Sequence, residues 1–571
     1  SKNTTNHIQT VGKHFRKKPH MQRLKKITIE NFRSIGEDPI EIEFPTEYPT
    51  VLLGENNAGK SNIIRAIELM FGEFHPKYKK LDNYDHFNRD EMNKISIDAE
   101  VSGFEARLGR NGEFSCSGFK YDCVKGSDSN FAAIQAENGE QNIYVSNNLR
   151  EELLCVVVNA EQNLNYQLSY SSKFTLLSKV TKAFHDKLIE DGERVGKLKE
   201  MFETIKSTFL EVEEFGAFNK NMSTIAGQML SNMSHALQFD FTAYDPSNYF
   251  KTLRVHPSED GETRAYEELG TGQQQVLALS FAHAYAKSFL GQGLIFILDE
   301  PEAHLHPLAQ KWLAKQMSKM AQDGLQLIIT THSPYFINLE FINGIYLVSK
   351  KEQTEISNTN ASELAEFCKA TGAQRADKKT IIPFYSSHSK PHILNGFFAK
   401  KIILVEGETE ELALPSYFEK IGLDTLKEGI AIIGVSGKGN LAKWWRLYKC
   451  YNIPTFICFD NDKKDDGKNR KRTEALKAIG IHDGEIEGLL NSDDWNINSN
   501  FCVFGADFET TMRNSFSRYA EIETEEIKRL GSSKPIVAKA VSERILNEDI
   551  NPEDIGWEQF NALKEFIELL E

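Results

Sequence analysis

Three carboxylates stand at the ends of apolar runs in the C-terminal half of this chain of 571 residues. Glu406 follows the run IILV, and Asp460 and Asp462 close the run TFICFDND. Because both runs are strand-length, these acids are expected at the carboxyl ends of strands, the edge at which open α/β sheets bind ligands. Carboxylates gathered there repel each other without a cation, and oxygen-only ligands suit Mg²⁺ or Mn²⁺. The pattern predicts a divalent-metal site.

A second constellation, GENNAGKS at 54–61, has the spacing of a phosphate-binding loop. Its glycines let the backbone curl so that N–H groups face phosphate oxygens, beside the start of the next helix. Lys60 is expected to neutralise the β- and γ-phosphates, and Ser61 to offer its hydroxyl to Mg²⁺. The residues expected at ATP in this loop are Gly54, Asn56, Asn57, Gly59, Lys60 and Ser61.

Two later segments fit the same nucleotide. GLIFILDE is a buried-strand pattern that ends in Asp299 and Glu300. Asp299 is expected to hold Mg²⁺ through water, and Glu300 to polarise the attacking water as a catalytic residue. LQLIITTHSP then places His332 after another apolar run, where it would sense the γ-phosphate. Together with the loop, these residues predict an ATPase.

The turn LGTGQQQ (269–275) completes the nucleotide pattern, because Gly270 and Gly272 precede a helical run and form another backbone cradle for phosphate. The ordered set resembles the ABC-type ATPases of the SMC, Rad50 and RecF kind. In that family two heads sandwich two ATP molecules, and the phosphate loop of one head faces this turn of the other. Thr271 departs from the family's LSGGQ but retains a hydroxyl.

These side chains need strands and helices to position them. Alternating apolar residues in 24–36 and the apolar run 48–54 predict strands before the phosphate loop, and SNIIRAIELMFG predicts a helix after it. In the C-terminal half, 402–405, 429–434 and 452–460 predict three more strands separated by helical stretches. The sequence therefore predicts an α/β fold.

Glu406-Gly407 followed by Asp460-x-Asp462 resembles the Toprim domain of topoisomerases, primases and some nucleases. An ABC-type ATPase joined at its C-terminus to a Toprim domain resembles the OLD (overcoming lysogenisation defect) nuclease family, from residue 21 onward. The resemblance implies an ABC-type ATPase domain with a helical insertion, then a Toprim α/β domain. It also implies two-metal cleavage of nucleic acid.

Further site residues rest on this resemblance. Glu410 occupies the place of a family acid that binds metal from the first Toprim helix. Asp507 and Glu509 would form a second metal cluster, expected on one face of a strand at i,i+2 spacing. The family lysine that steadies the transition state is assigned to Lys534, with Lys539 as the alternative.

The expected domains are a basic N-terminal extension (1–20), an ABC-type ATPase domain (21–164 and 236–349), a helical insertion (165–235), a linker (350–395) and a Toprim nuclease domain (396–571). Apolar residues spaced by three and four within the insertion predict two helices that form a hairpin. Two interpretations stay open for it: core helices packed on the ATPase domain, or a dimerisation arm. The polar linker is expected to hold one short helix, ASELAEFCKAT.

Charge and composition limit the mode of nucleic-acid binding and the cellular compartment that the sequence predicts. A net charge of −15 argues against general coating of nucleic acid but leaves room for a local basic track. Arg470, Lys471 and Arg472, close to Asp462, are expected to contact phosphates, with a solvated loop as the alternative. Seven irregularly spaced cysteines predict reduced thiols and a cytoplasmic protein, and no run approaches the ~20 apolar residues of a membrane span.

Together with the nucleotide and acid motifs, the resemblance implies a DNA endonuclease that uses ATP and Mg²⁺ (or Mn²⁺ at the nuclease site) and forms a homodimer or higher homo-oligomer. Family resemblance implies bacterial anti-phage defence, with a helicase-like protein or a retron reverse transcriptase and its RNA-linked DNA as partners of some members. The alternatives are an ABC-type repair or structural ATPase whose Toprim domain binds DNA without cutting, and a topoisomerase-like enzyme with a nucleophilic tyrosine.

Overall fold

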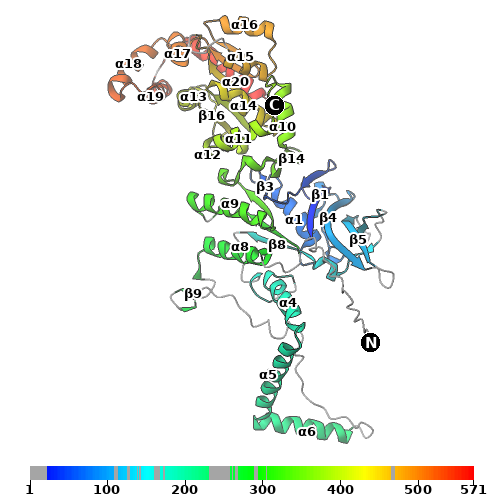
Figure 1. Ribbon diagram of the computed structural model, residues 1–571. Coiled ribbons are helices and arrows are strands. Elements are labelled where there is room, and N and C mark those ends of the chain that lie inside the picture. The colour runs from blue at the N-terminus through cyan, green and yellow to red at the C-terminus, as the bar shows by residue number, and fades with distance from the viewer. Residues whose placement is uncertain are drawn as a thin grey trace, which may run out of the picture. The chain divides into compact units, whose positions relative to one another are not determined.

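A computed structural model of the chain describes residues 22–107, 113–124, 129–137, 139, 143–159, 167–170, 174–229, 258–259, 262–263, 268–287, 293–303, 305–463, 470–548 and 550–570. The expected basic extension at 1–20 lies outside these residues. The described residues form two compact units, and Figure 1 labels most of their helices and strands. One unit falls within 1–30, 64–298 and 320–327, and the other within 31–63, 299–319 and 328–571. None of the described helices is both long and apolar enough to cross a membrane.

The N-terminal strands are β1 Arg23–Glu30, β2 Ile40–Glu43, β3 Thr50–Leu53, β4 Ile95–Arg107, β5 Glu113–Cys123, β6 Asn130–Gln135, β7 Ile143–Tyr144, β8 Leu153–Asn159, β9 Ser258–Glu259, β10 Glu262–Thr263, β11 Gly293–Asp299, β12 Gln326–Thr331, β13 Ile345–Lys350 and β14 Thr354–Asn358. The helices among them are α1 Lys60–Phe71, α2 Asn147–Arg150, α4 Leu176–Ile189, α5 Gly192–Leu210, α6 Glu213–Met229, α8 Thr271–Lys287 and α9 Pro307–Gln322. They form a mixed sheet of order β14-β13-β3-β12-β11-β8 and a sheet of order β2-β1-β4-β5-β6-β7.

The later elements are α10 Ala361–Ala370, α11 Lys378–His388, α12 Pro391–Leu394, β15 Lys401–Val405, α13 Glu408–Lys420, β16 Ile430–Gly434, α14 Leu441–Cys450, β17 Thr455–Asp460, α15 Arg470–Ala478, α16 Asp483–Asn491, β18 Asn496–Asn498, β19 Phe501–Phe504, α17 Phe508–Ser515, α18 Tyr519–Leu530, α19 Lys534–Asn547 and α20 Ile555–Leu569. Their sheet has the order β16-β15-β17-β19-β18. The expected α/β class is confirmed.

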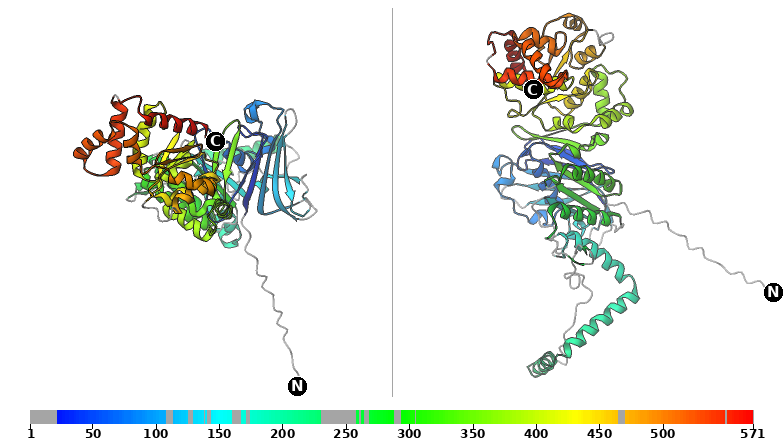
Figure 2. Two further views of the ribbon diagram at one scale, coloured as in Figure 1. Left: turned by 90° about the horizontal axis from the view of Figure 1, so that it is seen from above. Right: turned by 90° about the vertical axis from the view of Figure 1, so that its left-hand side faces the viewer.

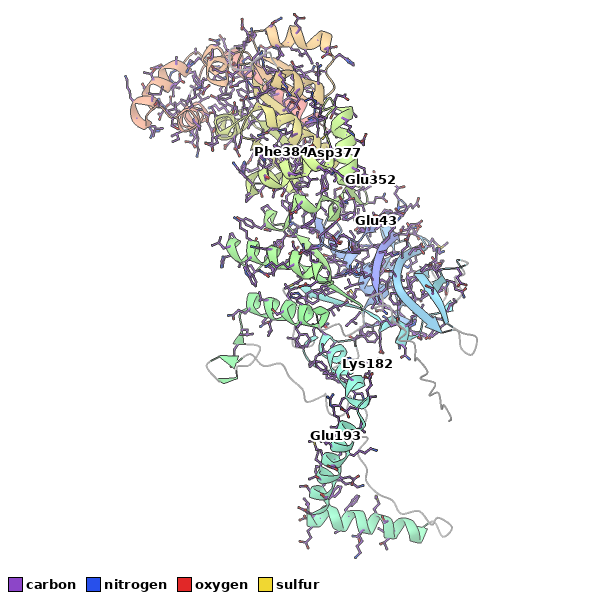
Figure 3. The ribbon with its side chains drawn as sticks, in the orientation of Figure 1. Glu43, Lys182, Glu193, Glu352, Asp377 and Phe384 are labelled. Atoms are coloured by element: carbon purple, nitrogen blue, oxygen red, sulfur yellow. The ribbon has the colours of Figure 1, made fainter. Side chains whose placement is uncertain are left out.

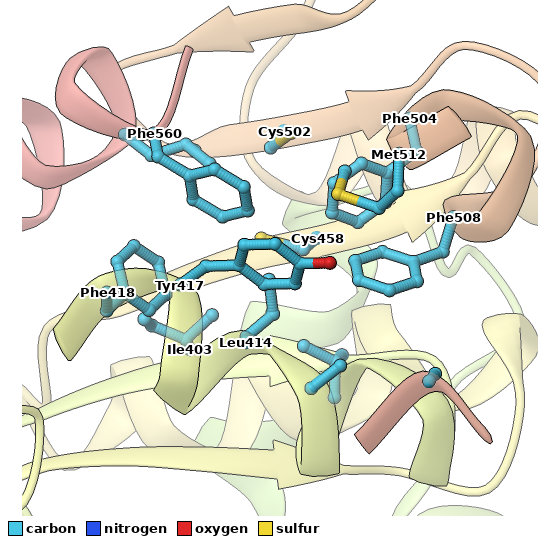
Figure 4. Packing of buried hydrophobic residues seen from close by; sticks show 14 of the residues in the cluster. Ile403, Leu414, Tyr417, Phe418, Cys458, Cys502, Phe504, Phe508, Met512 and Phe560 are labelled. Atoms are coloured by element: carbon cyan, nitrogen blue, oxygen red, sulfur yellow. The ribbon is translucent and has the colours of Figure 1, made fainter. Parts of the chain in front are cut away.

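Helices cover both faces of this C-terminal sheet because its strands are apolar on both sides. Alternate strand residues such as Ile403 and Phe504 pack with α13, α17 and α20 in one buried cluster (Figure 4). At its centre the ring of Tyr417 stacks on Phe560 with centroids 4.7 Å apart. Next along β15, Ile402 lies close to Gly396, which also contacts Tyr448 of α14.

The insertion differs from the expected hairpin. Figures 1 and 2 show α5 running on from α4 instead of folding back along it, so the hairpin prediction is wrong. The Asp191 carboxylate caps α5 by accepting hydrogen bonds from Glu193 and Arg194 N–H groups. In the predicted apolar stripe on α5 none of the described residues is buried: Val195, Leu198 and Phe202 are half-buried, and Ile205 is 43% exposed. Such exposure disfavours core helices packed on their own domain.

The segment expected as a linker is folded and holds more than one helix. Strand β14 pairs with β13, and helices α10, α11 and α12 follow it. Figure 3 labels the capping residue of α11, Asp377, and Phe384 within the helix. Asp377 accepts from the Lys379 N–H, and the centroid of the Phe384 ring lies 4.0 Å from the Lys443 ammonium. Polar composition therefore concealed a packed region here.

Candidate functional site

Parallel strands bring the predicted acids to one edge of the C-terminal sheet. Strands β16, β15, β17 and β19 run parallel, so their carboxyl ends lie at the same edge. Glu406 directly follows β15, Asp460 ends β17, and Asp507 comes three residues after β19 ends. The sequence-based placement of Glu406 and Asp460 at strand ends is confirmed.

The carboxylates of Glu406, Asp460 and Asp462 can each offer an oxygen such that all three oxygens lie within 4.8 Å of one another. The backbone N–H of Asp462 donates to the Ala506 carbonyl at 2.8 Å, which ties the acidic loop to the end of β19. Glu410 is buried at 3% exposure, and its carboxylate accepts from the Gly407 N–H at 3.2 Å. This capping contact draws the Glu410 side chain back toward the strand end.

Burial and mutual repulsion disfavour the ionised forms of these acids. Burial raises the pKa of Glu410 to about 7, and the nearby charges of Glu406 and Glu509 act in the same direction. Burial raises the pKa of Asp460 well above its ordinary value, with further contributions from Glu410, Glu406 and Asp462. Burial also raises the pKa of Glu406, against the opposing charge of Lys438. Such a cluster gains most from a bound cation.

The acid cluster fits a divalent cation. Oδ1 of Asp460 is buried without a hydrogen-bond partner among the described residues, although it lies beside two further carboxylates. A buried polar atom of this kind needs a partner, and an all-oxygen donor set matches Mg²⁺ or Mn²⁺. Glu406, Asp460 and Asp462 would hold the ion, with Glu410 beside them.

Lys438 is a site residue that the sequence reasoning missed. Its side chain is 5% exposed, and its Nζ lies 3.1 Å from Asp462 Oδ2 and 3.4 Å from Glu406 Oε2. A strained turn after β16 carries it, with Ser436 at φ 59° and Gly437 at φ 117°, while Gly437 N–H donates to the Glu406 carbonyl at 2.8 Å. The signal was available, because a lysine in a glycine-rich turn after a strand also identified Lys60.

Arg472 does not contact phosphate as predicted. It is 1% exposed, and its guanidinium donates to the backbone carbonyl and the side-chain oxygen of Asn461. Asn461 in turn donates to the carbonyls of Leu490 at 3.0 Å and Ser492 at 2.8 Å. Arg472 therefore fixes the loop between the two aspartates, and the prediction for this residue is wrong. Lys464 and Lys468 of the same basic stretch lie outside the described residues.

The second acid pair stands at a helix start. Asp507 caps α17 by accepting from the Thr510 N–H at 2.6 Å, and Glu509 lies in the first turn, so the expected strand placement is wrong. Burial acts to raise the pKa of Asp507, but the Thr510 hydrogen bonds and the charges of Lys534 and Arg513 lower it. The charge of Glu509 raises the pKa of Glu410, which links the two acid groups electrostatically.

Lys534 begins α19, and its Nζ lies 3.6 Å from Glu509 Oε1. The charge of Glu509, followed by those of Asp507 and Asp460, raises the pKa of Lys534. Lys534, Asp507 and Glu509 line one cavity of about 200 Å³. The alternative, Lys539, pairs instead with Glu543 on the same helix at 3.7 Å. The structure thus favours Lys534 over Lys539.

The phosphate loop follows β3, as predicted. Gly54 at φ 149° and Gly59 at φ 114° have backbone angles that side chains rarely adopt, and a Cβ on Gly59 would stand 2.2 Å from Thr354 Oγ1. Lys60 is buried, and its Nζ donates to the carbonyls of Gly54 and Glu55, each at 2.9 Å. Burial lowers the pKa of Lys60. Ser61 and the loop residues Asn56 and Asn57 are exposed.

The predicted partners of this loop assemble around Lys60. His332 Nε2 lies 3.0 Å from Lys60 Nζ and 3.2 Å from Glu300 Oε1. The Asp299 carboxylate accepts from the Thr330 hydroxyl. Lys60, Asp299, Glu300 and His332 therefore form one polar cluster at the ends of β3, β11 and β12.

Glu302 is a second residue that the sequence reasoning missed. Its Oε1 accepts from the His332 N–H at 2.5 Å and from the Thr331 hydroxyl at 2.9 Å. It therefore anchors the loop that presents the His332 ring. The acidic run after β11 contained the signal, since a third carboxylate follows Glu300 by two positions.

Gly270 and Gly272 stand at the start of α8, where they were expected. The Gly270 carbonyl accepts from the N–H groups of Gln273 and Gln274 in the first helical turn. These glycines belong to the first compact unit and the phosphate loop to the second. Their contact with ATP stays a prediction.

Comparisons with known proteins match both halves. The family model described as "Overcoming lysogenization defect protein-like, TOPRIM domain" matches residues 397–462. The model described as "AAA ATPase domain" matches residues 23–193 and 121–337, which together make up more than half of the chain.

Similar proteins include the OLD nuclease of Thermus scotoductus, 27% identical over 82% of this chain and 89% of that protein. The Old nuclease of Escherichia phage P2 is 24% identical over 77% of each chain. Among solved structures, the Pyrococcus furiosus Smc head domain with an extended coiled coil is 14% identical, with a TM-score of 0.37, and the match covers 61% of this chain and 99% of that one.

Proposed function

The chain belongs to the OLD family, in which an AAA ATPase domain precedes a Toprim domain, and from this membership we propose that it is an ATP-dependent, divalent-metal-dependent DNA endonuclease. The observation that carries the proposal is the acid cluster at the carboxyl edge of the C-terminal sheet. Its three carboxylates converge within 4.8 Å, and one buried oxygen, Asp460 Oδ1, lacks a partner among the described residues.

Each group has a role in this proposal. Bound divalent ions would ease attack by water on the phosphodiester and stabilise the departing oxygen. Glu406, Asp460 and Asp462 would hold the first ion, and Asp507 and Glu509 would hold the second. Lys534, close to Glu509 and 72% exposed, is free to reach the strand and to balance charge on the phosphate in the transition state.

Replacement of Asp460 by asparagine tests the nuclease. Asp460→Asn keeps the side-chain shape but removes a metal ligand, so Mg²⁺- or Mn²⁺-dependent cleavage of plasmid DNA should fall by about a thousandfold or more. The affinity for ATP should stay within about twofold of the wild-type value, which is the error of a titration, because Asp460 is distant from the phosphate loop in sequence and belongs to another predicted site. Cleavage at the wild-type rate would refute the proposal and favour an ATPase whose Toprim domain only binds DNA.

We also propose a basic track that guides the DNA backbone to the acids. Arg470 and Lys471 begin α15, and a Cβ on Gly439, next to Lys438, would stand 3.7 Å from the Lys471 side chain. Arg470 also lines a cavity of about 610 Å³ together with Arg375 and Lys477. Lys471 thus lies beside the turn that carries Lys438, and for cleavage a phosphate backbone must lie close to the metal ligands that Lys438 contacts.

A salt titration tests this track. The double variant Arg470→Gln with Lys471→Gln should reduce the slope of log affinity against log salt by about two, because two phosphate contacts are lost. Lys400→Gln with Lys427→Gln is the matched control, since these lysines precede β15 and β16 at the opposite edge. An unchanged slope in the first variant would show that Arg470 and Lys471 are solvated and do not contact phosphate.

Homodimerisation belongs to the same proposal. Exposed apolar side chains lie along α4, α5 and α6, including Ile189, Met201, Val212 and Ile225, each at least 46% exposed. A second copy is the occupant that would cover them and form the dimerisation arm. In such a dimer the α8 turn of one copy would face the phosphate loop 54–61 of the other.

The wider setting follows from family membership. We propose a cytoplasmic role in bacterial anti-phage defence, which accords with a 25% identity over 40% of this chain to a Bacillus cereus protein named Endonuclease GajA. A helicase-like protein, or a retron reverse transcriptase with its RNA-linked DNA, is the class of partner to seek. Affinity capture from an infected host, with sequencing of bound nucleic acid, tests both.

A further inference from the structure

The nuclease site carries its own internal cation. Lys438 Nζ stands between Asp462 Oδ2, at 3.1 Å, and Glu406 Oε2, at 3.4 Å, and its side chain is 5% exposed. A buried ammonium group is costly unless acids compensate it, and here two of the three metal-ligating acids do so. Lys438 therefore holds these carboxylates where a metal ion would otherwise hold them.

The turn around Lys438 fixes this arrangement. Gly437 N–H donates to the Glu406 carbonyl at 2.8 Å, and Asn440 Nδ2 donates to the Val435 carbonyl at 3.0 Å. Ser436 and Gly437 both have positive φ angles, 59° and 117°. Such strain persists where the surrounding structure over-determines it, which is common at functional sites. The backbone of this turn therefore places the Lys438 side chain beside Glu406 and Asp462.

We propose that Lys438 is a resident counter-ion that divalent metal must displace, and that its ammonium group then turns to a non-bridging oxygen of the DNA phosphate. This inference rests on the proposed nuclease function and deepens it. A lysine that stays near a bound dication repels it, so Lys438 weakens metal binding. The same charge strengthens the hold on phosphate, since four acids around one dication leave the site negative. Metal therefore binds more tightly when DNA gives Lys438 another partner.

Titration of the full-length, EDTA-treated protein with Mn²⁺, followed by electron paramagnetic resonance of the free ion, tests the first part. Lys438→Met should bind Mn²⁺ about tenfold more tightly than the wild type, because the competing charge is gone. Lys438→Arg keeps the charge and should stay within about threefold. Lys463→Met is the matched control: Lys463 follows Asp462 directly, but its ammonium pairs with Asp493 at 2.7 Å. Equal or weaker Mn²⁺ binding by a folded Lys438→Met protein would overturn the proposal.

DNA binding in Ca²⁺, which supports binding without requiring turnover, tests the second part. Lys438→Met should reduce the salt slope by about one, the loss of a single phosphate contact. An unchanged slope would overturn the transfer of Lys438 to phosphate. The variant Asp460→Asn distinguishes failure of the proposed nuclease function from failure of the counter-ion proposal. If Asp460→Asn leaves Mn²⁺ binding intact, the metal site and the proposed function fail. If it abolishes Mn²⁺ binding while Lys438→Met changes nothing, only the counter-ion proposal fails.

Discussion

Glu410 should destabilise the metal-free protein at neutral and alkaline pH. Its carboxyl group is 3% exposed, and burial raises its pKa from 4.5 to about 7. The folded protein therefore binds this proton more tightly than the unfolded chain does. The contribution of the protonated Glu410 carboxyl group to the free energy of unfolding is fully present below pH 4.5 and is lost as the pH rises through about 7. Replacing Glu410 with glutamine removes the ionisation and keeps the oxygen that accepts from the Gly407 N–H.

The structure gives the magnitude. The difference between 4.5 and about 7 corresponds to about 3 kcal/mol in the free energy of unfolding. Glu410→Gln should thus be more stable than the wild type by about 3 kcal/mol at pH 8.5 and indistinguishable from it near pH 4.5. Glu408→Gln is the control, because Glu408 is an exposed acid in the same helical turn. It should change stability by less than about 0.5 kcal/mol.

Urea unfolding in EDTA, followed by tryptophan fluorescence, measures the effect. Of the five tryptophans, Trp444, Trp445, Trp495 and Trp557 lie in the C-terminal 176 residues, so the signal reports chiefly on the domain that holds Glu410. Added Mn²⁺ should reverse the order, stabilising the wild type more than Glu410→Gln. A Glu410→Gln protein no more stable than the wild type at pH 8.5 would refute the burial argument.

Three other predictions concern separate parts of the chain. Lys60→Ala should lower ATP affinity in a fluorescent-nucleotide titration by at least about a hundredfold, because the buried ammonium at the phosphates is lost; near-normal affinity would rule out this loop as the nucleotide site. Arg472→Ala should cost about 3 kcal/mol in urea unfolding by leaving Asn461 without its buried donor, and a neutral effect would show that Arg472 does not support the acidic loop. If the proposed homodimer forms through α4, α5 and α6, Ile205→Glu with Val212→Glu should yield a monomer in analytical ultracentrifugation and slow ATP hydrolysis; a sedimentation coefficient equal to that of the wild type would exclude this surface as a dimer interface.

The strand-end residues were predictable from sequence, because the pattern that predicts each of them lies within one short segment. Glu406, Asp460 and Asp299 each close an apolar run, and such a run in an α/β chain ends at the ligand-binding edge. The phosphate loop was predictable because its glycines and Lys60 act within one short segment. Confirmed placements of this kind need no knowledge of which strands are neighbours.

Other features depend on contacts between distant residues, and the sequence could not supply them. Arg472 resembled a phosphate ligand because its neighbours are basic, yet its burial depends on Asn461, eleven positions away. Asp507 and Glu509 were placed on a strand by their spacing. The D-x-x-T pattern ending at Thr510, a helix-capping signal, would have placed Asp507 correctly. In the expected linker, Pro383 inside α11 masked the helical pattern.

Strand β14 also bears on where the chain could be cut to separate the ATPase domain from the C-terminal module. The Thr354 hydroxyl donates to the Ala58 carbonyl at 3.0 Å and lies 2.7 Å from the Ser34 hydroxyl, which accepts from Asn62 Nδ2 at 2.6 Å. The last strand before α10 therefore contacts and supports the predicted phosphate loop. A cut at residue 350, where the composition changes, would remove β14 from the ATPase domain. The predicted nucleotide loop would then lack its contact with Thr354. We therefore expect a junction for exchanging the C-terminal module to preserve the nucleotide loop when it lies beyond Asn358, where β14 ends.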